Sequence, residues 1–264
     1  MKEARFIIAG CGGAMGRAVI EAALAAGAAI AGGVERDGAP CLGADLGALV
    51  GAEPIGAIAA TLAETRLAPD NVIIDFTSPA ASLALAEAAA AAGAAHVMAS
   101  TGFSADEDAA VAALAQKVPI VKSGNMSLGV NLLCALVEKA ARALDDRYDI
   151  EITEAHHRRK VDAPSGTALM LADAAATGRG VSLKAHAAHD RRGARVIGDI
   201  GFAVSRGGGV VGDHDVAFAG DREVVAFSHR AIDRGLFADG ALTAARWVHG
   251  RAPGLYSMRD VLGV

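Results

Sequence analysis

Apolar and polar residues alternate along the first half of the chain in blocks that predict strands and helices in turn. Short apolar runs of strand length are followed by longer Ala-rich runs of helix length, and glycines separate them. Such alternation is typical of a parallel sheet covered by helices on both faces. The predicted strands are 5–9, 28–34, 71–76, 95–99 and 119–122, and the predicted helices are 14–26, 80–92 and 105–116. Residues 37–60 are rich in Gly and Ala and receive no assignment.

The pattern changes after Asn125-Met126-Ser127, where a helix is expected to run to Leu144. In the next segment, 148–154, apolar residues alternate with polar ones, which predicts a strand with one buried face. A helix at 165–176 and three further strands, at 194–204, 209–218 and 222–229, follow. We expect these strands to form a mixed or antiparallel open sheet, with a tight turn at 219–221. An open edge needs cover, and association of subunits is one way to supply it.

A last helix at 233–249 is expected to return to the first domain. The predicted fold class is therefore α/β, with a Rossmann-like parallel-sheet domain and a second α+β domain that has an open mixed sheet. We expect residues 1–125 with 235–264 to form a dinucleotide-binding domain. Residues 126–234 are expected to form a domain for substrate binding and oligomerisation.

Composition narrows the setting in which the protein works. Hydrophobic residues make up 53% of the 264 residues, but aromatic residues only 4%, so the excess is mainly alanine rather than the bulky apolar residues of a membrane segment. The first ten residues are too short for a secretory signal, so a cytoplasmic protein is expected. The net charge of −5 argues against nonspecific nucleic-acid binding. Cys11, Cys41 and Cys134 lie far apart without paired spacing, so neither a disulfide nor a metal site is expected.

A glycine-rich loop follows the first predicted strand and opens the first predicted helix. Its sequence, Gly10-Cys11-Gly12-Gly13-Ala14-Met15-Gly16, suits a loop that lets the backbone approach a pyrophosphate, although the third glycine comes one position later than in the common fingerprint. A merely tight turn is the alternative. Glu35 ends the second strand, where a carboxylate accepts hydrogen bonds from ribose hydroxyls. Arg36 suits adenine stacking or a 2'-phosphate, so we expect both NADH and NADPH to be accepted. The alternative for this pair is two solvated charges.

Polar residues also follow the next parallel strands, at the sheet edge where ligands of such folds bind. They include Thr77, Ser78, Ser100, Thr101 and Asn125. Capping of the following helices is the competing interpretation for Thr77, Ser78, Ser104 and Asn125.

The segment 154–167 carries the densest chemistry of the chain. His156 and His157 titrate near neutrality, Lys160 adds an ammonium, and Ser165-Gly166-Thr167 opens a helix whose amino end attracts carboxylate. Together they suit a site that binds an acid and gives it a proton. Metal binding is a weaker alternative, because neighbouring residues of a strand point to opposite faces. The remaining histidines are interpreted as structural or surface residues: His96, His186, His189, His214, His229 and His249.

With these residues in view, the chain resembles the 4-hydroxy-tetrahydrodipicolinate reductase (dihydrodipicolinate reductase) family of lysine and diaminopimelate synthesis. The most specific element is Glu154-Ala155-His156-His157 followed by Lys160-Val161-Asp162-Ala163-Pro164-Ser165-Gly166-Thr167. The resemblance implies that His156 is the proton donor, that Lys160 is a second catalytic cation, and that His157, Ser165, Gly166 and Thr167 bind substrate. It also implies a homotetramer. The implied coenzyme contacts are Gly10, Cys11, Gly12, Gly13, Ala14, Met15, Glu35, Arg36, Ala99, Ser100, Thr101, Ser123, Gly124, Asn125 and Met126.

The chain departs from the family pattern at two places. Ala99-Ser100 stands where the family usually has Gly-Thr, and Gly124 stands where it has Ala or Pro. The implied activity is NADH- or NADPH-dependent reduction of 4-hydroxy-tetrahydrodipicolinate, a small dicarboxylate, to tetrahydrodipicolinate, with no nucleic-acid or membrane partner. Two alternatives stay open: a dehydrogenase of another small imino or keto diacid, such as an aspartate dehydrogenase, and a non-catalytic NAD(P)-dependent metabolite sensor.

Overall fold

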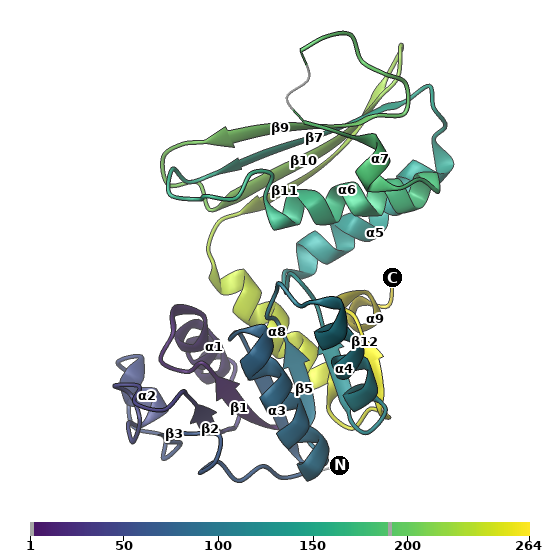
Figure 1. The fold of residues 1–264 in the computed structure, drawn as a ribbon. Coiled ribbons are helices and arrows are strands. Elements are labelled where there is room, and N and C mark those ends of the chain that lie inside the picture. Colours follow the sequence, from purple (N-terminus) through teal and green to yellow (C-terminus); the bar gives the residue numbers. More distant parts are fainter. Residues whose placement is uncertain (1–2, 190–191) are drawn as a thin grey trace. The chain divides into compact units, whose positions relative to one another are not determined.

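The computed structural model describes residues 3–189 and 192–264 and divides into two compact units (Figure 1). The first unit contains residues 1–127 and 235–263, and the second contains residues 128–234. Each unit has its own sheet and its own buried core. No helix among the described residues is long and apolar enough to cross a membrane.

The first unit is built on a seven-stranded sheet in the order β12-β6-β5-β4-β1-β2-β3. All of its neighbouring strands pair in parallel. The central strand β4 is buried at every residue, as a parallel strand covered on both faces requires. The strands are β1 (Arg5–Ala9), β2 (Ile30–Val34), β3 (Ala59–Ala60), β4 (Asn71–Asp75), β5 (Ala95–Met98), β6 (Pro119–Lys122) and β12 (Gly254–Tyr256).

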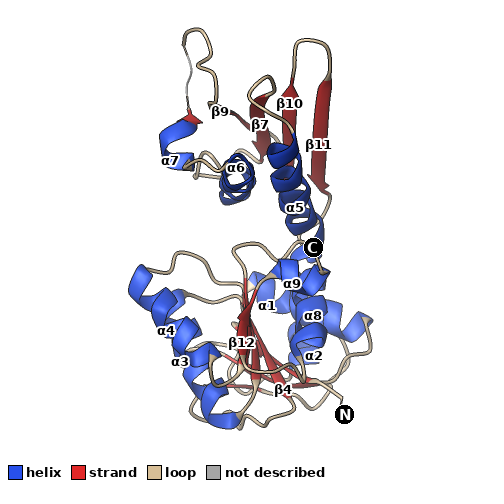
Figure 2. Ribbon diagram, turned by 90° about the vertical axis from the view of Figure 1, so that its right-hand side faces the viewer, coloured by secondary structure: helices blue, strands red, loops and turns tan. Residues whose placement is uncertain are grey.

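Helices cover both faces of this sheet, with α3 and α4 on one side and α1 and α8 on the other (Figure 2). Local sequence explains where several of them begin and end. Ser104 and Glu107 form a capping box at the start of α4, and Gly93 ends α3 with a φ of 72°. The helices are α1 (Ala14–Ala25), α2 (Leu46–Leu49), α3 (Pro79–Ala92), α4 (Ala105–Ala115), α8 (Gly235–Val248) and α9 (Met258–Leu262).

The second unit has a five-stranded sheet in the order β11-β10-β7-β9-β8. Its pairs β11–β10 and β10–β7 are antiparallel, whereas β7–β9 and β9–β8 are parallel, so the predicted mixed sheet is confirmed. Helices α5 and α6 pack against each other and against its inner face. The elements are α5 (Leu128–Ala143), β7 (Asp149–His156), α6 (Gly166–Arg179), α7 (Leu183–His186), β8 (Ala187–Ala188), β9 (Ile200–Arg206), β10 (Gly212–Ala219) and β11 (Val224–Ala231).

Period-two alternation fixes which side chains of β7 face the core. Ile150 and Ile152 are buried with Val216 and Phe218 of β10, while Thr153 on the other face is exposed. The hairpin between β10 and β11 is as predicted, with Gly220 N donating to Glu223 O at 2.9 Å.

Two parts of the prediction need correction or addition. The strand expected at 194–204 begins only at Ile200, because residues 196–199 form a turn in which Asp199 N donates to Val196 O at 3.2 Å. In the same loop, the side chain of Arg195 donates to Glu151 and to the carbonyl oxygen of Asp199. The segment 37–60, left unassigned, contains α2 and β3, and Asp45 caps α2 by accepting from Gly47 N at 2.8 Å. The short elements β8, β12 and α9 were not expected.

Candidate functional site

The glycine loop between β1 and α1 has the backbone geometry that a dinucleotide loop needs. Gly10 has a φ of 70°, which favours glycine, and a Cβ on Gly16 would lie 2.1 Å from the carbonyl oxygen of Gly10. Gly13 occupies the N-cap of α1 and has no side chain to bond the first-turn N–H groups. Ala14 is exposed and Met15 half-buried beside it. The amino end of α1 is therefore open to an anionic ligand.

Glu35 connects the end of β2 to this loop rather than standing free in solvent. Its Oε2 accepts from Gly12 N at 3.1 Å, and its Oε1 accepts from Arg36 N at 3.1 Å. Cys11 and Cys41 also lie here, although their sequence separation predicted no association. Both are free thiols, and burial, with Cys41 and Glu35 beside it, raises the pKa of Cys11 to about 12.

A buried polar network lies under the carboxyl ends of β4 and β5. Asp75 accepts hydrogen bonds from Ser82 and from Thr77 Oγ1, and His96 Nε2 lies 3.3 Å from it. Ser82 also bonds Ser100 Oγ at 2.7 Å. Burial alone would raise the pKa of Asp75, but the hydrogen bonds from His96, Ser82 and Thr77 outweigh it and hold that pKa below its ordinary value.

Helix capping was the competing interpretation for four polar residues at this edge of the sheet, and the structure shows what each side chain does. Ser104 caps α4, whereas Ser78 occupies the N-cap of α3 without a side-chain bond. Thr77 bonds Asp75 instead of the helix. Asn125 Oδ1 accepts from Ser127 N at 2.8 Å, which closes a turn ahead of α5.

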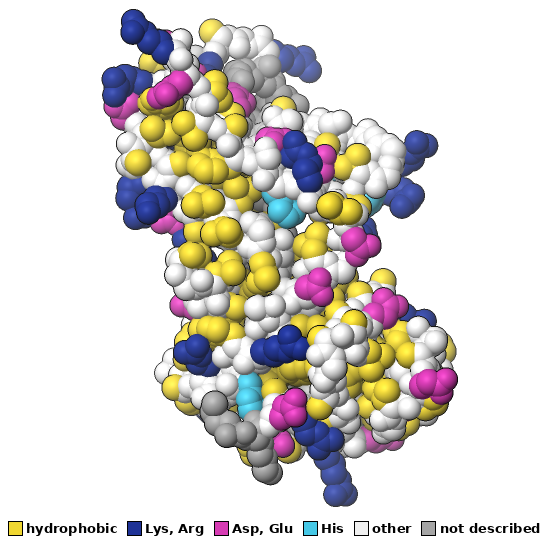
Figure 3. Space-filling model, turned by 180° about the vertical axis from the view of Figure 1, so that it is seen from behind, with side chains coloured by type: hydrophobic (Ala, Val, Ile, Leu, Met, Phe, Trp, Pro, Cys, Tyr) yellow, Lys and Arg dark blue, Asp and Glu magenta, His cyan; other side chains and the backbone are white. Residues whose placement is uncertain are grey.

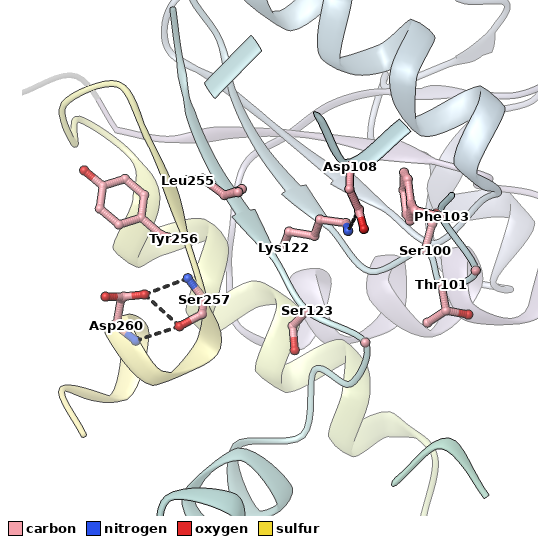
Figure 4. A pocket seen from close by; sticks show the side chains of 12 residues that line it. Ser100, Thr101, Phe103, Asp108, Lys122, Ser123, Leu255, Tyr256, Ser257 and Asp260 are labelled. Atoms are coloured by element: carbon pink, nitrogen blue, oxygen red, sulfur yellow. Dashed lines mark hydrogen bonds and ion pairs between the residues drawn. The ribbon is translucent and has the colours of Figure 1, made fainter. Parts of the chain in front are cut away.

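A cavity of about 510 Å³ opens beside this network, within the first unit (Figure 4). Four of the residues predicted to contact the coenzyme line it: Ser100, Thr101, Ser123 and Gly124. Residues 255–257 and Asp260 line another side of the cavity. Lys122 and Asp108 also line it, and their side chains point toward each other and form an ion pair. Of the other predicted residues at this edge, Ala99 and Asn125 are half-buried and Met126 is buried; none of the three lines the cavity.

In the second unit, Glu154 organises the histidine segment. Glu154 lies on the inner face of β7, is 1% exposed, and accepts from His156 Nδ1 at 2.5 Å. Arg206 of β9 donates to both of its carboxylate oxygens at 2.8 Å, and Ser165 N donates at 3.0 Å. Burial would raise the pKa of Glu154, but these bonds outweigh it and lower the pKa. The carboxylate thus stays ionised and fixes one nitrogen of the imidazole.

His156 is 7% exposed, and its environment disfavours the charged imidazolium. Burial lowers its pKa below the ordinary value, against the opposing effect of Glu154 and with a further lowering from the nearby charge of Lys160. Since Nδ1 is held by Glu154, Nε2 is the nitrogen left to exchange a proton with a ligand.

Two histidines that the sequence left as structural or surface residues lie beside His156. The rings of His156 and His214 are 5.0 Å apart edge to face, and His229 follows at 6.3 Å from His214. Burial lowers the pKa of His214 to about 4, and His214 Nε2 lies 3.2 Å from Ser165 Oγ. The neutral imidazole can therefore accept a hydrogen bond from the hydroxyl group of Ser165. His214 belongs to the buried lining of this site.

The remaining predicted residues surround the start of α6. Ser165 is the N-cap, accepts from Ala168 N at 3.2 Å and is 1% exposed, whereas Gly166 is exposed and Thr167 half-buried. His157 is half-buried, with Nε2 3.3 Å from Arg234, and Lys160 Nζ lies 2.9 Å from Asp162. The structure thus brings the predicted catalytic and substrate residues together around β7 and α6. Ser165, however, uses its side chain inside the protein.

Sequence reasoning missed the partners of His156. From the sequence, Glu154 was recognised only as part of the family motif, and Arg206 was not predicted to belong to the site. A signal did exist for Glu154, because a period-two strand places residues 154 and 156 on the same face. An acid on the otherwise apolar face of a strand needs a partner.

The glycine loop, the parallel sheet and the acid after β2 define an α/β protein of the dinucleotide-binding class. Comparison with known proteins narrows this class. Residues 4–126 match the model for the N-terminus of dihydrodipicolinate reductase, and residues 129–262 match the model for its C-terminus. The chain belongs to the dihydrodipicolinate reductase family.

Curated relatives agree with this assignment, and a solved structure has a similar fold. The chain is 53% identical to the 4-hydroxy-tetrahydrodipicolinate reductase of Rhodopseudomonas palustris strain BisA53, over 100% of this chain and 98% of the relative. It is 52% identical to that of Parvibaculum lavamentivorans, over 99% and 98%. A dipicolinate-bound dihydrodipicolinate reductase from Paenisporosarcina sp. TG-14 has a similar fold, with a TM-score of 0.77 at 20% identity over 98% of this chain and 99% of that chain.

Proposed function

We propose that the protein reduces 4-hydroxy-tetrahydrodipicolinate to tetrahydrodipicolinate with NADH or NADPH. In this reaction the substrate loses water and gains one hydride and one proton. Relatives that carry this activity in their names are about half identical over the full length. The observation that carries the proposal is the buried Glu154–His156 pair beside the amino end of α6, since it holds a proton donor next to a site for carboxylate.

The cationic groups around β7 and α6 bind the two carboxylates of the substrate. Lys160 supplies an ammonium, and His157 supplies a second polar group. The exposed start of α6 at Gly166 and Thr167 supplies backbone N–H groups, and Ser165 forms the cap that shapes this start. These groups orient the ring as well as neutralise its charge, which lowers the entropic part of the barrier.

His156 then supplies the proton that the reduction requires. As hydride reaches the conjugated ring, electron density accumulates at the far side of the conjugated system, and Nε2 of the imidazolium donates to it. Glu154 holds Nδ1 and offsets the positive charge, and Arg206 holds Glu154 in turn. A bound dicarboxylate raises the pKa of His156 again, because a negative ligand favours the imidazolium.

The residues of the glycine loop fit a nicotinamide dinucleotide. Gly10 to Met15 and the open first turn of α1 suit the pyrophosphate, and Glu35 with Arg36 suits the adenosine half. We assign the polar residues around the cavity of the first unit, with Ala99, Asn125 and Met126 beside them, to the nicotinamide half. When bound, the reduced coenzyme supplies the hydride.

We also propose a cytoplasmic homotetramer without nucleic-acid or membrane partners. Exposed apolar side chains on edge strand β11, Val224 and Val225, support association through the open sheet. The net charge of −5, with acidic and basic side chains interspersed on the face in Figure 3, supports a small-molecule substrate rather than a polyanion. Light scattering of the purified protein tests the tetramer.

A coupled assay tests the activity directly. Product freshly made by dihydrodipicolinate synthase is added with NADH or NADPH, and loss of nicotinamide absorbance is followed. An aspartate dehydrogenase would instead turn over oxaloacetate with ammonia, and a sensor would bind coenzyme without turnover. Nothing in the fold or the site favours these two alternatives. Absence of turnover with the synthase product would refute the proposal.

Lys160 offers a matched pair of variants for the binding step. We expect Lys160→Ala to lower turnover at least about a hundredfold, the scale of a lost charged group in a preorganised site. Coenzyme binding, measured by nicotinamide fluorescence, should persist. The control is Lys139→Ala, an exposed lysine on α5, which should leave turnover unchanged.

A further inference from the structure

Three side chains with metal-ligating atoms meet next to the glycine loop, outside the histidine site. They come from three segments: Cys11 from the loop after β1, Glu35 from the end of β2, and Cys41 from the loop that follows. Their two sulfur atoms and a carboxylate oxygen all lie within 4.8 Å of one another. The segments converge because β1 and β2 are parallel neighbours, with Ala9 opposite Val34, so their carboxyl ends lie side by side.

Glycine at position 12 makes room for this arrangement. A Cβ on Gly12 would lie 2.6 Å from Cys41 Sγ and 3.2 Å from Glu35 Oε2, so any other residue would push the sulfur and the carboxylate away. Cys11 is fully buried, and Cys41 and Glu35 are half-buried. The cluster is therefore reachable from solvent on the side of Cys41 and Glu35.

Two cysteine sulfurs and one carboxylate suit a thiophilic divalent cation, which displaces the thiol protons when it binds. Zinc binds cysteine sulfur at about 2.3 Å and carboxylate oxygen at about 2.0–2.2 Å in a tetrahedron, which places neighbouring ligand atoms roughly 3.3–3.8 Å apart. Ligand atoms within 4.8 Å reach that spacing through small side-chain movements. Three protein ligands leave a fourth position for water, and the cation offsets the negative charges that the ionised groups would bring together.

We propose that Cys11, Cys41 and Glu35 form a binding site for a thiophilic divalent cation of the zinc class, and that occupation of this site opposes binding of the dinucleotide. Glu35 is the link between the two events. A carboxylate that ligates the cation is withdrawn from the ribose hydroxyls and from Gly12 N, which lies in the pyrophosphate loop. The proposed competition depends on the glycine loop binding the coenzyme, as proposed above. The proposed binding of the cation does not depend on it.

A second cluster of possible ligands, Glu154, His156 and His214, does not support the same inference. There the carboxylate already accepts two hydrogen bonds from Arg206 and one from Ser165 N. A cation at that place would face a fixed guanidinium. Glu35, beside the glycine loop, instead accepts hydrogen bonds from the backbone N–H groups of Gly12 and Arg36.

Cadmium titration tests the cation site without coenzyme. The full-length protein, treated with chelator and kept reduced by a phosphine, is titrated with Cd²⁺ while the near-ultraviolet thiolate-to-cadmium absorbance is followed. We expect one equivalent per chain, with affinity at least tenfold lower in Cys41→Ser and in Cys11→Ser. Cys134→Ala, which alters a cysteine of the other unit, is the matched control and should titrate like the wild type. Absorbance that persists in a Cys11→Ser/Cys41→Ser double variant overturns the site.

Zinc then tests the link to the coenzyme. We expect the apparent Kd for NADH, from nicotinamide fluorescence, to rise with Zn²⁺ and the Kd for Zn²⁺ to rise by the same factor with NADH, because linkage is reciprocal. The half-buried side chain of Cys41 tolerates replacement by serine. The Cys41→Ser variant should therefore bind NADH with an apparent Kd that does not change when Zn²⁺ is added. If Zn²⁺ binds through both thiols and leaves NADH affinity unchanged, the competition is wrong. If cadmium binds as expected but NADH does not bind at all, the proposed coenzyme role fails and the cation site stands.

Discussion

Each unit of the protein contains a buried carboxylate paired with a buried imidazole, yet only one of the pairs is equipped for chemistry. In the first unit, Asp75 and His96 have side chains that are 0% exposed. In the second, the side chain of Glu154 is 0% exposed and the side chain of His156 is 9% exposed. Both carboxylates also hold a group near the start of a helix, Ser82 in one case and Ser165 N in the other.

The difference lies in what surrounds each imidazole. His96 Nδ1 is buried and has no hydrogen-bond partner among the described residues, so a proton has no route to it from a ligand. The pair joins β4, β5 and α3 and belongs to the scaffold. His156, in contrast, is slightly open, and Arg206 holds its carboxylate partner. The accessible imidazole and the cation that holds its carboxylate partner are therefore the two features that suit His156, rather than His96, to the proton transfer proposed above.

The largest expected effect separates the two histidines. We predict that His156→Gln lowers kcat at least about a hundredfold, the lower bound of general-acid assistance, while NADH binding persists. Steady-state kinetics and nicotinamide fluorescence measure both quantities. His96→Gln is the comparison: it should lower the free energy of unfolding while kcat changes only a few-fold. Equal losses of kcat in both variants would erase the distinction.

The next prediction concerns the pH dependence of stability. An unfolded histidine has a pKa of about 6.5, but burial lowers the pKa of His214 to about 4, so the unfolded chain takes up the proton first as pH falls. The contribution of His214 to the free energy of unfolding is fully present above about pH 6.5. It decreases as the pH falls toward 4, by up to about 3 kcal/mol. Urea denaturation across this range should show a smaller loss in His214→Gln. Parallel curves for the two proteins would contradict the assignment.

A smaller effect tests whether Glu154 positions His156. Glu154→Gln keeps the size of the side chain but removes the charge that holds the imidazole and pairs with Arg206. We expect kcat to fall about ten- to a hundredfold, as when a buried hydrogen-bonded partner is lost. The kcat–pH profile should move to lower pH, because the imidazolium loses its stabilising charge. Glu154→Asp should restore part of the rate. A lower rate with an unchanged pH profile would indicate a purely structural role.

The smallest effect concerns the choice of coenzyme. Arg36 is exposed at the end of β2 and can contact a 2'-phosphate, while Glu35 favours a free ribose. We predict that the wild type prefers neither coenzyme by more than a few hundredfold and that Arg36→Ala lowers kcat/KM for NADPH several-fold while leaving NADH little changed. Kinetics with both coenzymes decides this. A preference beyond several hundredfold in the wild type would show that one of the two residues dominates.

Sequence alone predicted the parallel sheet and most helix positions. This was possible because the hydrophobic periodicity of strands and helices, and the glycines that separate them, are local signals. The strands it missed, β3, β8 and β12, are two or three residues long, and the helices it missed, α2, α7 and α9, have four or five residues, too few to show a period. The polar partners of the site were harder for another reason. Arg206 and His214 meet Glu154 and His156 only through the register of β7 with β9 and β10, which pairing fixes and composition does not. Cys11 and Cys41 meet through a loop without any pattern.

The return of the chain to the first unit affects how that unit is made during synthesis. Strand β12 pairs with β6 at the sheet edge, and α8 packs on β4 and β5, although both follow the whole second unit in sequence. A nascent chain that has emerged only as far as residue 127 therefore lacks α8 on one face of its sheet and β12 at one edge. The second unit can close on its own elements first, and the sheet of the first unit is completed only after β12 has left the ribosome.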